Sequence, residues 1–174
     1  MPKCVLFLRG INVGGNNLIK MAELRDIAAG LGWQNPRTYL QSGNLVVELD
    51  SNNPAKDLEH ALQQILNLDV AVISRVGEEL ASVVSANPFT NEAKSDPSHL
   101  VVIFLPQVPP SALVERVQSA MTGPERLVDG GRELYVYYPA GIGDSKIGKT
   151  PGWKELTSSG TARNWNTVLK LASI

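Results

Sequence analysis

Short apolar runs alternate with amphipathic helical stripes through the first 75 residues, and the order of these elements restricts the possible folds. Cys4–Leu8 is short, apolar and bounded by Gly10, as expected of a buried strand. The apolar positions between Met21 and Leu31 repeat at the spacing of one helical face. Two strands, a helix and a further strand follow. The resulting order, βαββαβ, is typical of a ferredoxin-like α/β plait, which is an α+β fold.

The residues between these elements favour the same boundaries. Gln41-Ser42-Gly43-Asn44 separates the strands Arg37–Leu40 and Leu45–Leu49, and its Gly and Asn tolerate the positive φ of a tight hairpin turn. Asn53 is a suitable N-cap, and Pro54 suits the first position of the second helix. Val70–Ile73 is the predicted last strand of the first unit.

The second half of the chain repeats most of this order. After a short helix around Leu80, the segment Ala86–Ser98 is predicted to be a loop and the seam between the halves. Two strands, a helix and a third strand are expected between residues 100 and 138, in the order β-α-β-β. A glycine-rich stretch and a helix over Ala162–Leu171 follow. We therefore expect two tandem ferredoxin-like units, residues 1–76 and 77–174, the second of which lacks or replaces its last strand.

Composition excludes several classes of function. The net charge is -1, so no overall field attracts the chain to nucleic acid or to an anionic membrane. The chain has one cysteine, Cys4, and two histidines, which argues against a metal site of the usual Cys/His kind. No metal, no cofactor and no membrane partner are expected, and a reducing cytoplasm is the expected location. Residues 1–42 and 140–174 each carry a net charge of +3, and these segments share one basic face if the termini lie near each other.

The segment after the first strand is the first candidate binding site. Arg9, Asn12, Gly14 and Gly15 lie in a loop rich in glycine and asparagine, and Lys20 follows it. Glycines let a backbone approach a ligand, and Arg can bind a phosphate or carboxylate through two parallel hydrogen bonds. The alternative, with about equal weight, is a structural loop whose asparagine side chains cap turns.

Three further segments supply candidate ligand-binding residues. Thr161 is the predicted N-cap of the last helix, and Arg163, Asn164 and Asn166 are predicted to lie in its first turns. Arg163, Asn166, Thr167 and Lys170 share a donor-rich face of this helix, although Arg163 and Asn166 could instead only solvate an exposed face or brace a neighbouring loop. Lys146 follows a glycine-rich loop and is a candidate partner for a ligand's charge. The neighbouring Ser145 is not favoured as a nucleophile. Ser42 and Asn44 project from the predicted hairpin, or only shape its turn.

Four motifs together resemble the bacterial family called domain of unknown function 1697: Arg9-Gly10-Ile11-Asn12-Val13-Gly14-Gly15, Lys20-Met21-Ala22-Glu23-Leu24, Tyr39-Leu40-Gln41-Ser42-Gly43-Asn44 and Thr161-Ala162-Arg163-Asn164-Trp165-Asn166-Thr167. The resemblance spans nearly the whole chain. It implies a fold of two ferredoxin-like plaits and no established activity.

Three functions follow as hypotheses. The first is binding of a small anionic, phosphorylated molecule in a cleft between the two units. The second, supported more weakly, is an RNA-binding or other nucleic-acid-binding module that uses Tyr135 and Tyr137 on one strand face. The third is a structural or protein-interaction role, as a monomer or a homodimer. Catalysis is left open, and only Glu23 is a nearby candidate base.

Overall fold

The computed structural model describes all 174 residues. Contacts between Cα atoms divide the chain into two compact units, Met1–Ala81 with Leu171–Ile174, and Ser82–Lys170. Each unit contains one four-stranded antiparallel sheet and helices, so the fold is α+β. The domain division at residues 76 and 77 stays a prediction. No helix in the chain has both the length and the apolar character needed to cross a membrane.

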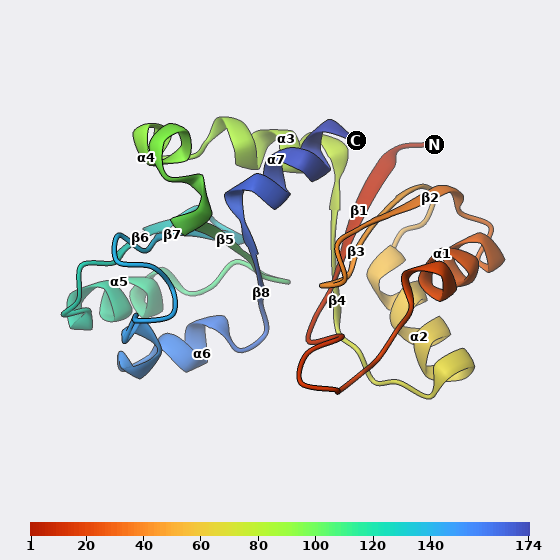
Figure 1. Ribbon diagram of the computed structural model, residues 1–174, viewed down its shortest axis with the longest axis horizontal. Helices are drawn as coiled ribbons and strands as arrows, with labels where there is room; N and C mark the ends of the chain where they lie inside the picture. The colour runs from red at the N-terminus through yellow and green to blue at the C-terminus, as the bar shows by residue number, and fades with distance from the viewer. The chain divides into compact units, whose positions relative to one another are not determined.

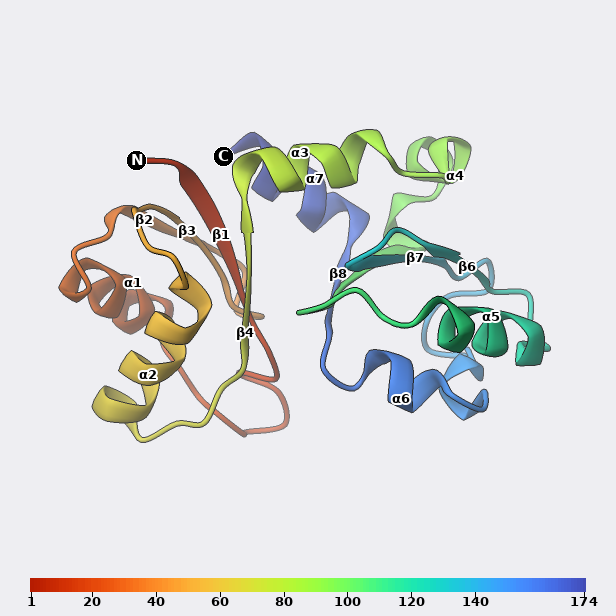
Figure 2. The same cartoon turned by 180° about the vertical axis from the view of Figure 1, so that it is seen from behind.

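The first unit has the expected βαββαβ order (Figure 1). Its elements are β1 (Lys3–Leu8), α1 (Met21–Gly30), β2 (Gln34–Tyr39), β3 (Asn44–Glu48), α2 (Pro54–Leu66) and β4 (Val72–Val76). The strands lie in the order β2-β3-β1-β4, and each neighbouring pair is antiparallel. In both views α1 and α2 cover one face of this sheet (Figures 1 and 2).

Local chemistry explains the ends of α2. The Asn53 side chain accepts a hydrogen bond from the Lys56 backbone N–H, and Pro54 occupies the first turn, as predicted. The helix ends at Asn67, which adopts a left-handed conformation with φ 54°. Asparagine is one of the few residues other than glycine that adopt this conformation readily.

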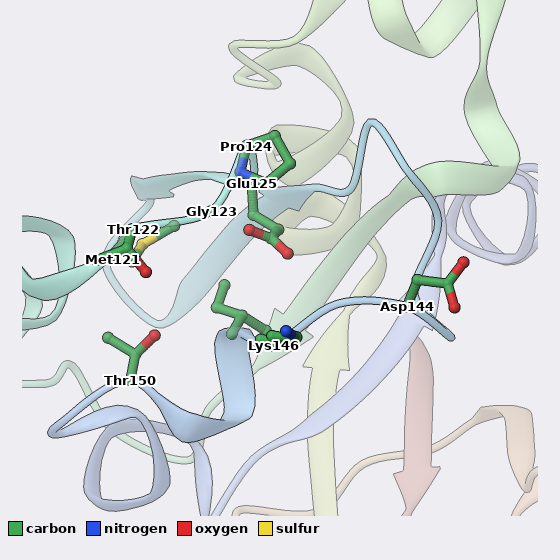
Figure 3. Close-up of a pocket in the computed structure, with 9 residues that line it drawn as sticks. Met121, Thr122, Gly123, Pro124, Glu125, Asp144, Lys146 and Thr150 are labelled. Carbon is green, nitrogen blue, oxygen red and sulfur yellow. The ribbon is translucent and has the colours of Figure 1, made fainter.

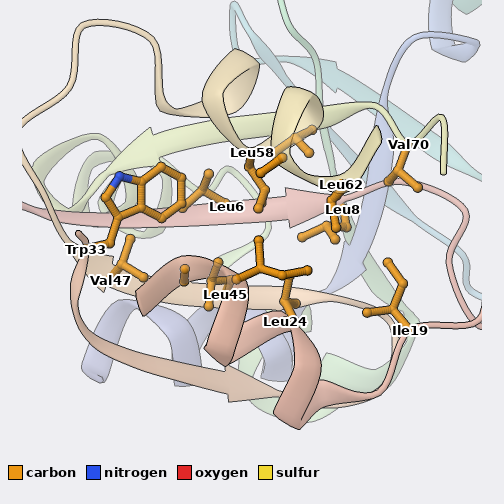
Figure 4. Close-up of a cluster of buried hydrophobic side chains, with 14 of the residues drawn as sticks. Leu6, Leu8, Ile19, Leu24, Trp33, Leu45, Val47, Leu58, Leu62 and Val70 are labelled. Atoms are coloured by element: carbon orange, nitrogen blue, oxygen red, sulfur yellow. The ribbon is translucent and has the colours of Figure 1, made fainter. Parts of the chain in front are cut away.

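The core of the first unit lies between its sheet and its two helices. Leu6 and Leu8 of β1 and Leu45 of β3 face Leu24 of α1 and Leu58 of α2, and all five are almost completely buried (Figure 4). Burying such side chains stabilises the fold by roughly 1.5 to 3 kcal/mol each. The inward-facing apolar residues of the strands and the apolar faces of the helices thus form one buried layer.

The prediction of a loop over Ala86–Ser98 is wrong in part, because Thr90–Ser95 forms a helix. Helix α3 (Gly77–Ser85) is followed by α4 (Thr90–Ser95) and by a 3₁₀ turn, η1 (Pro97–His99). No side chain of α4 is buried, so the segment lacks the apolar stripe by which a helix is recognised in a sequence.

The second unit repeats the sheet of the first (Figure 2). Its elements are β5 (Leu100–Phe104), α5 (Ser111–Ala120), β6 (Arg126–Asp129), β7 (Glu133–Tyr137), a 3₁₀ turn η2 (Ile147–Lys149), α6 (Trp153–Thr157), β8 (Thr161–Asn164) and α7 (Trp165–Ser173). The strand order is β6-β7-β5-β8, again with every pair antiparallel. Helices α5 and α6 cover one face of this sheet.

The prediction that the second unit lacks or replaces its last strand is wrong. Strand β8 pairs with β5 from Thr161 opposite Phe104 to Asn164 opposite Val101. The helix predicted over Ala162–Leu171 therefore begins only at Trp165. The physical reason is that residues 161–164 alternate between buried and exposed positions, which is the period of a strand.

Candidate functional site

The loop after β1 is held in place by the side chain of Asn12. Its Nδ2 donates to the backbone oxygens of Ile19 at 3.0 Å and of Gln41 at 2.8 Å, and its Oδ1 accepts from the Ile19 N–H at 2.9 Å. Asn12 also adopts a positive φ of 54°. The amide group of Asn12 is thus occupied by contacts that shape the loop.

Gly14 and Gly15 form the tip of this loop. The Asn16 N–H donates to the Val13 oxygen at 3.0 Å, and the two glycines between them have φ values of 57° and 77°. Positive φ at both central residues is the requirement of a type I′ hairpin turn, which glycine satisfies at little cost. The turn accounts for both glycines without a ligand.

Ser42 and Asn44 shape the hairpin between β2 and β3. Asn44 is completely buried, and its Nδ2 donates to the Tyr39 oxygen at 2.7 Å and to the Ser42 Oγ at 3.3 Å. Gly43, with φ 89°, lies so close to β1 and to the loop after it that an added Cβ would be 3.0 Å from Leu8 Cβ and 2.6 Å from a side-chain atom of Ile11. Of the two interpretations of this turn, these contacts support the architectural one.

Arg9 and Lys20 are the exposed cations of the same region. The backbone N–H of Arg9 donates to the Ala71 oxygen at 2.9 Å, and that of Lys20 donates to the Glu23 carboxylate at 3.3 Å. The structure thus brings the Asn12 loop to the hairpin turn within the first unit. Binding of a ligand by these residues stays a prediction.

In the second unit Arg163 lies on β8 and is buried, with 7% of its surface exposed. Its Nη1 donates to the Thr161 hydroxyl at 2.7 Å and to the Ala162 backbone oxygen at 2.9 Å. Burial lowers the pKa of this guanidinium to about 10, so the group keeps its charge at neutral pH.

Asn164 and Asn166 have different positions from those predicted. Asn164 ends β8, and its Oδ1 accepts from the Thr167 N–H at 2.9 Å, so it caps α7 in the place predicted for Thr161. Asn166 is exposed, whereas Arg163 and Thr167 are buried. The predicted donor-rich helical face of Arg163, Asn166 and Thr167 is therefore wrong, because Arg163 belongs to a strand.

Lys146 lines a pocket of the second unit with a volume of about 260 Å³ (Figure 3). We call it the Lys146 pocket. It is formed by the segment that joins α5 to β6 and by the segment around η2, and its lining residues are Met121, Thr122, Gly123, Pro124, Glu125, Asp144, Lys146, Ile147 and Thr150. Of these residues only Lys146 is predicted from the sequence, because Glu125 and Thr122 lie more than twenty residues away in the chain.

Glu125 is fixed beside Lys146 by its neighbours. The Ser145 hydroxyl donates to Glu125 Oε1, and Ser145 Oγ accepts from the Ile147 N–H at 3.2 Å. Figure 3 shows the Glu125 carboxylate pointing toward the side of the pocket that Lys146 occupies. Burial raises the pKa of the neighbouring Tyr138 to about 12, and the negative charge of Glu125 adds to this shift. The pocket thus contains groups of both charges.

A second polar cluster in this unit was not predicted. The Asp96 Oδ2 accepts hydrogen bonds from the Tyr137 hydroxyl at 2.8 Å and from His99 Nδ1 at 2.9 Å. The Tyr137 hydrogen bond, followed by that of His99, lowers the pKa of Asp96, and the same carboxylate raises the pKa of Tyr137. Arg126 lies 5.0 Å from the ring centre of Phe89 and 5.3 Å from that of Tyr137. The cluster joins η1 to β7.

Tyr135 does not support the nucleic-acid hypothesis. It is buried, with 3% of its surface exposed, and its hydroxyl donates to the Val83 oxygen at 2.7 Å. A buried ring cannot stack on a base. No group of three or more His, Cys, Asp or Glu side chains is arranged to hold a metal ion. The expected absence of metal and cofactor stays a prediction.

The family comparison agrees with the motifs in the sequence. Residues 1–135 match the family model described as protein of unknown function (DUF1697). The chain belongs to this family. The resemblance inferred from the sequence is therefore confirmed, and membership in the DUF1697 family brings no activity with it.

One solved structure supports the fold of this DUF1697 chain. It is that of the conserved bacterial protein SP0830 from Streptococcus pneumoniae, with 23% sequence identity and a TM-score of 0.77. The similarity covers 99% of this chain and 97% of the other. No curated protein matches the chain.

Proposed function

We propose that this DUF1697 protein binds a small molecule with an anionic group in the Lys146 pocket. The observation that carries the proposal is the position of Lys146 in a pocket that also has the hydroxyl groups of Thr122 and Thr150 in its lining. An ammonium and two hydroxyls are donors that suit phosphate or carboxylate oxygens. The sequence-based prediction of an anionic, phosphorylated ligand is the starting point of this proposal.

The size of the pocket limits the ligand. Its volume of about 260 Å³ lies just below the roughly 300 to 1,000 Å³ of most small-molecule sites. The ligand in this proposal is therefore a small metabolite.

The test is thermal unfolding in the presence of inorganic phosphate, small phosphorylated metabolites and small carboxylates. A ligand at about one hundred times its Kd stabilises the folded state by about 2.7 kcal/mol, which raises Tm by roughly 5 to 11 °C for a chain of this length. Lys146→Met should abolish the shift. Lys149→Met, which changes an exposed lysine of η2 outside the pocket lining, should preserve it. An unchanged shift in Lys146→Met, or no shift with any ligand that has an anionic group, amino acids included, contradicts the proposal.

We also propose that each unit is a ferredoxin-like α/β plait. In support of this, the strand orders β4-β1-β3-β2 and β8-β5-β7-β6 correspond element by element, and each sheet is antiparallel throughout. A cytoplasmic location and a monomeric or dimeric state stay predictions.

A further inference from the structure

We propose that the ligand of the Lys146 pocket is a zwitterion of amino-acid size, whose anionic group binds Lys146 and whose ammonium group binds Glu125. This inference rests on the proposed function and narrows its substrate class. It depends on three features of the pocket, which are its charges, the fixed position of Glu125 and its volume.

The charges of the pocket do not suit a simple anion. Its lining has one cationic side chain, Lys146, and two carboxylates, Glu125 and Asp144. An anion beside Lys146 is also repelled by the negative charge of the carboxylates in the lining, and this repulsion opposes the attraction of the lysine. If the ligand also has an ammonium group, the carboxylates attract that group, and the ligand gains a second favourable interaction.

Glu125 is held where such an ammonium can reach it. One of its oxygens accepts the Ser145 hydroxyl, and Ser145 is itself fixed by the Ile147 N–H. A carboxylate has about four acceptor positions, so the hydrogen bond from Ser145 leaves capacity for an ammonium, which has three donors. In Figure 3 the Glu125 carboxylate points toward Lys146, whereas the Asp144 carboxylate points away from it. Glu125 is therefore the primary partner of the ammonium group.

Gly123 provides the space in which Glu125 lies. A Cβ added at Gly123 would overlap the Oε2 atom of Glu125 and lie 3.1 Å from its Cδ. The carboxylate thus folds directly over a residue without a side chain. Alanine at this position forces the flexible carboxylate to move while the charge of the pocket stays the same.

The experiment is isothermal titration calorimetry with the standard protein amino acids, and then with two analogues of the tightest one. These are its des-amino carboxylic acid and its decarboxylated amine. We expect the zwitterion to bind at least about tenfold more tightly than either analogue, which corresponds to about 1.4 kcal/mol. Glu125→Gln should weaken the zwitterion by about the same factor without weakening the carboxylic acid. Lys146→Met should weaken both.

Two further variants separate position from charge. Gly123→Ala should weaken the zwitterion as Glu125→Gln does, since it displaces the carboxylate. Glu115→Gln, an exposed residue of α5 outside the pocket lining, should leave every affinity unchanged.

The outcomes distinguish this inference from the proposed function. If the carboxylic acid or inorganic phosphate binds through Lys146 as tightly as any amino acid, the zwitterion is wrong and the anion site stands. If neither amino acids nor anions bind, both proposals are wrong. Zwitterion binding that Glu125→Gln leaves unchanged also contradicts the inference.

Discussion

The side-chain amide of Asn12 donates a hydrogen bond to the backbone oxygen of Gln41 at 2.8 Å. The two residues are 29 positions apart, so this contact joins the loop before α1 to the turn between β2 and β3. The same amide also pairs with both backbone groups of Ile19. Asn12 therefore organises one end of the first unit, which is the structural alternative for the glycine- and asparagine-rich motif.

Asn12→Ala should destabilise the protein. It removes three hydrogen bonds, worth about 1 kcal/mol each, and places alanine at a positive φ, which costs roughly a further 1 kcal/mol. We expect the free energy of unfolding, measured in urea, to fall by about 2 to 4 kcal/mol. Asn12→Gly should lose about 1 kcal/mol less, because glycine accepts this backbone conformation. Asn166→Ala, which changes an exposed asparagine, is the control. An equal fall in its free energy of unfolding would contradict the structural role of Asn12.

Gly43→Ala should be more damaging than Gly30→Ala. The new Cβ would lie 2.6 Å from Ile11 Cδ1 and 3.0 Å from Leu8 Cβ, at a φ of 89°. Crowding of this kind costs about 1 to 3 kcal/mol, and the left-handed backbone adds about 1 kcal/mol. Gly30→Ala in α1 meets no atom within 4 Å and should leave the protein as stable or slightly more stable. The midpoints of thermal unfolding of the two variants measure this difference, and equal midpoints would contradict the prediction.

Arg163→Ala tests whether the last motif is architectural. The substitution removes the hydrogen bonds that the charged Nη1 donates to Thr161 and Ala162 and leaves the buried Thr161 hydroxyl without this donor, so a loss of about 2 to 3 kcal/mol in unfolding free energy is expected. Arg116→Ala, which breaks an exposed pair with Glu155, should cost at most about 1 kcal/mol. Equal stability of the two variants would show that the bonds of Arg163 contribute little.

The first unit was predictable because its periodicities are simple. Strands β1, β3 and β4 are largely apolar, α1 and α2 have regular apolar stripes, and Asn53-Pro54 marks the start of α2. These signals depend only on neighbouring residues. The βαββαβ order therefore follows from the sequence without knowledge of tertiary contacts.

Strand β8 was not predictable in the same way. Its two buried residues are Thr161 and Arg163, and a search for apolar patterns does not identify a strand whose buried side chains are polar.

Only one residue of the Lys146 pocket could be predicted from the sequence, for a different reason. Lys146 and Glu125 line one pocket because the segments before β6 and around η2 fold against each other. No pattern of neighbouring residues in the sequence predicts this contact between distant segments.

The Asp96 cluster gives a prediction for the pH dependence of Tyr137. Because the Asp96 carboxylate raises the pKa of Tyr137, Asp96→Asn should move this pKa back toward about 10, the ordinary value for tyrosine. Absorbance of tyrosinate during a titration to high pH measures the change. Glu115→Gln is the control and should leave the curve unchanged. An identical curve in Asp96→Asn would exclude the coupling.

The same pair affects stability at the two ends of the pH range. The pKa of Asp96 is lowered in the folded state, so its contribution is present above the unfolded value of about 3.9 and is lost as pH falls through the folded pKa. The pKa of Tyr137 is raised, so its contribution is present below about 10 and is lost at higher pH. The stability of Asp96→Asn should therefore vary less with pH than that of the wild type at both ends.

Cys4 should be inert toward thiol reagents in the folded protein. The residue is 1% exposed, and burial, followed by the charge of Glu79, raises the pKa of its thiol to about 12. A rise of about three units lowers the thiolate fraction at pH 8 roughly a thousandfold, and only the thiolate reacts. A disulfide reagent should therefore label the native protein slowly, and denaturant should make labelling rapid and complete. Rapid labelling without denaturant would show that the end of β1 that carries Cys4 opens readily in the native state.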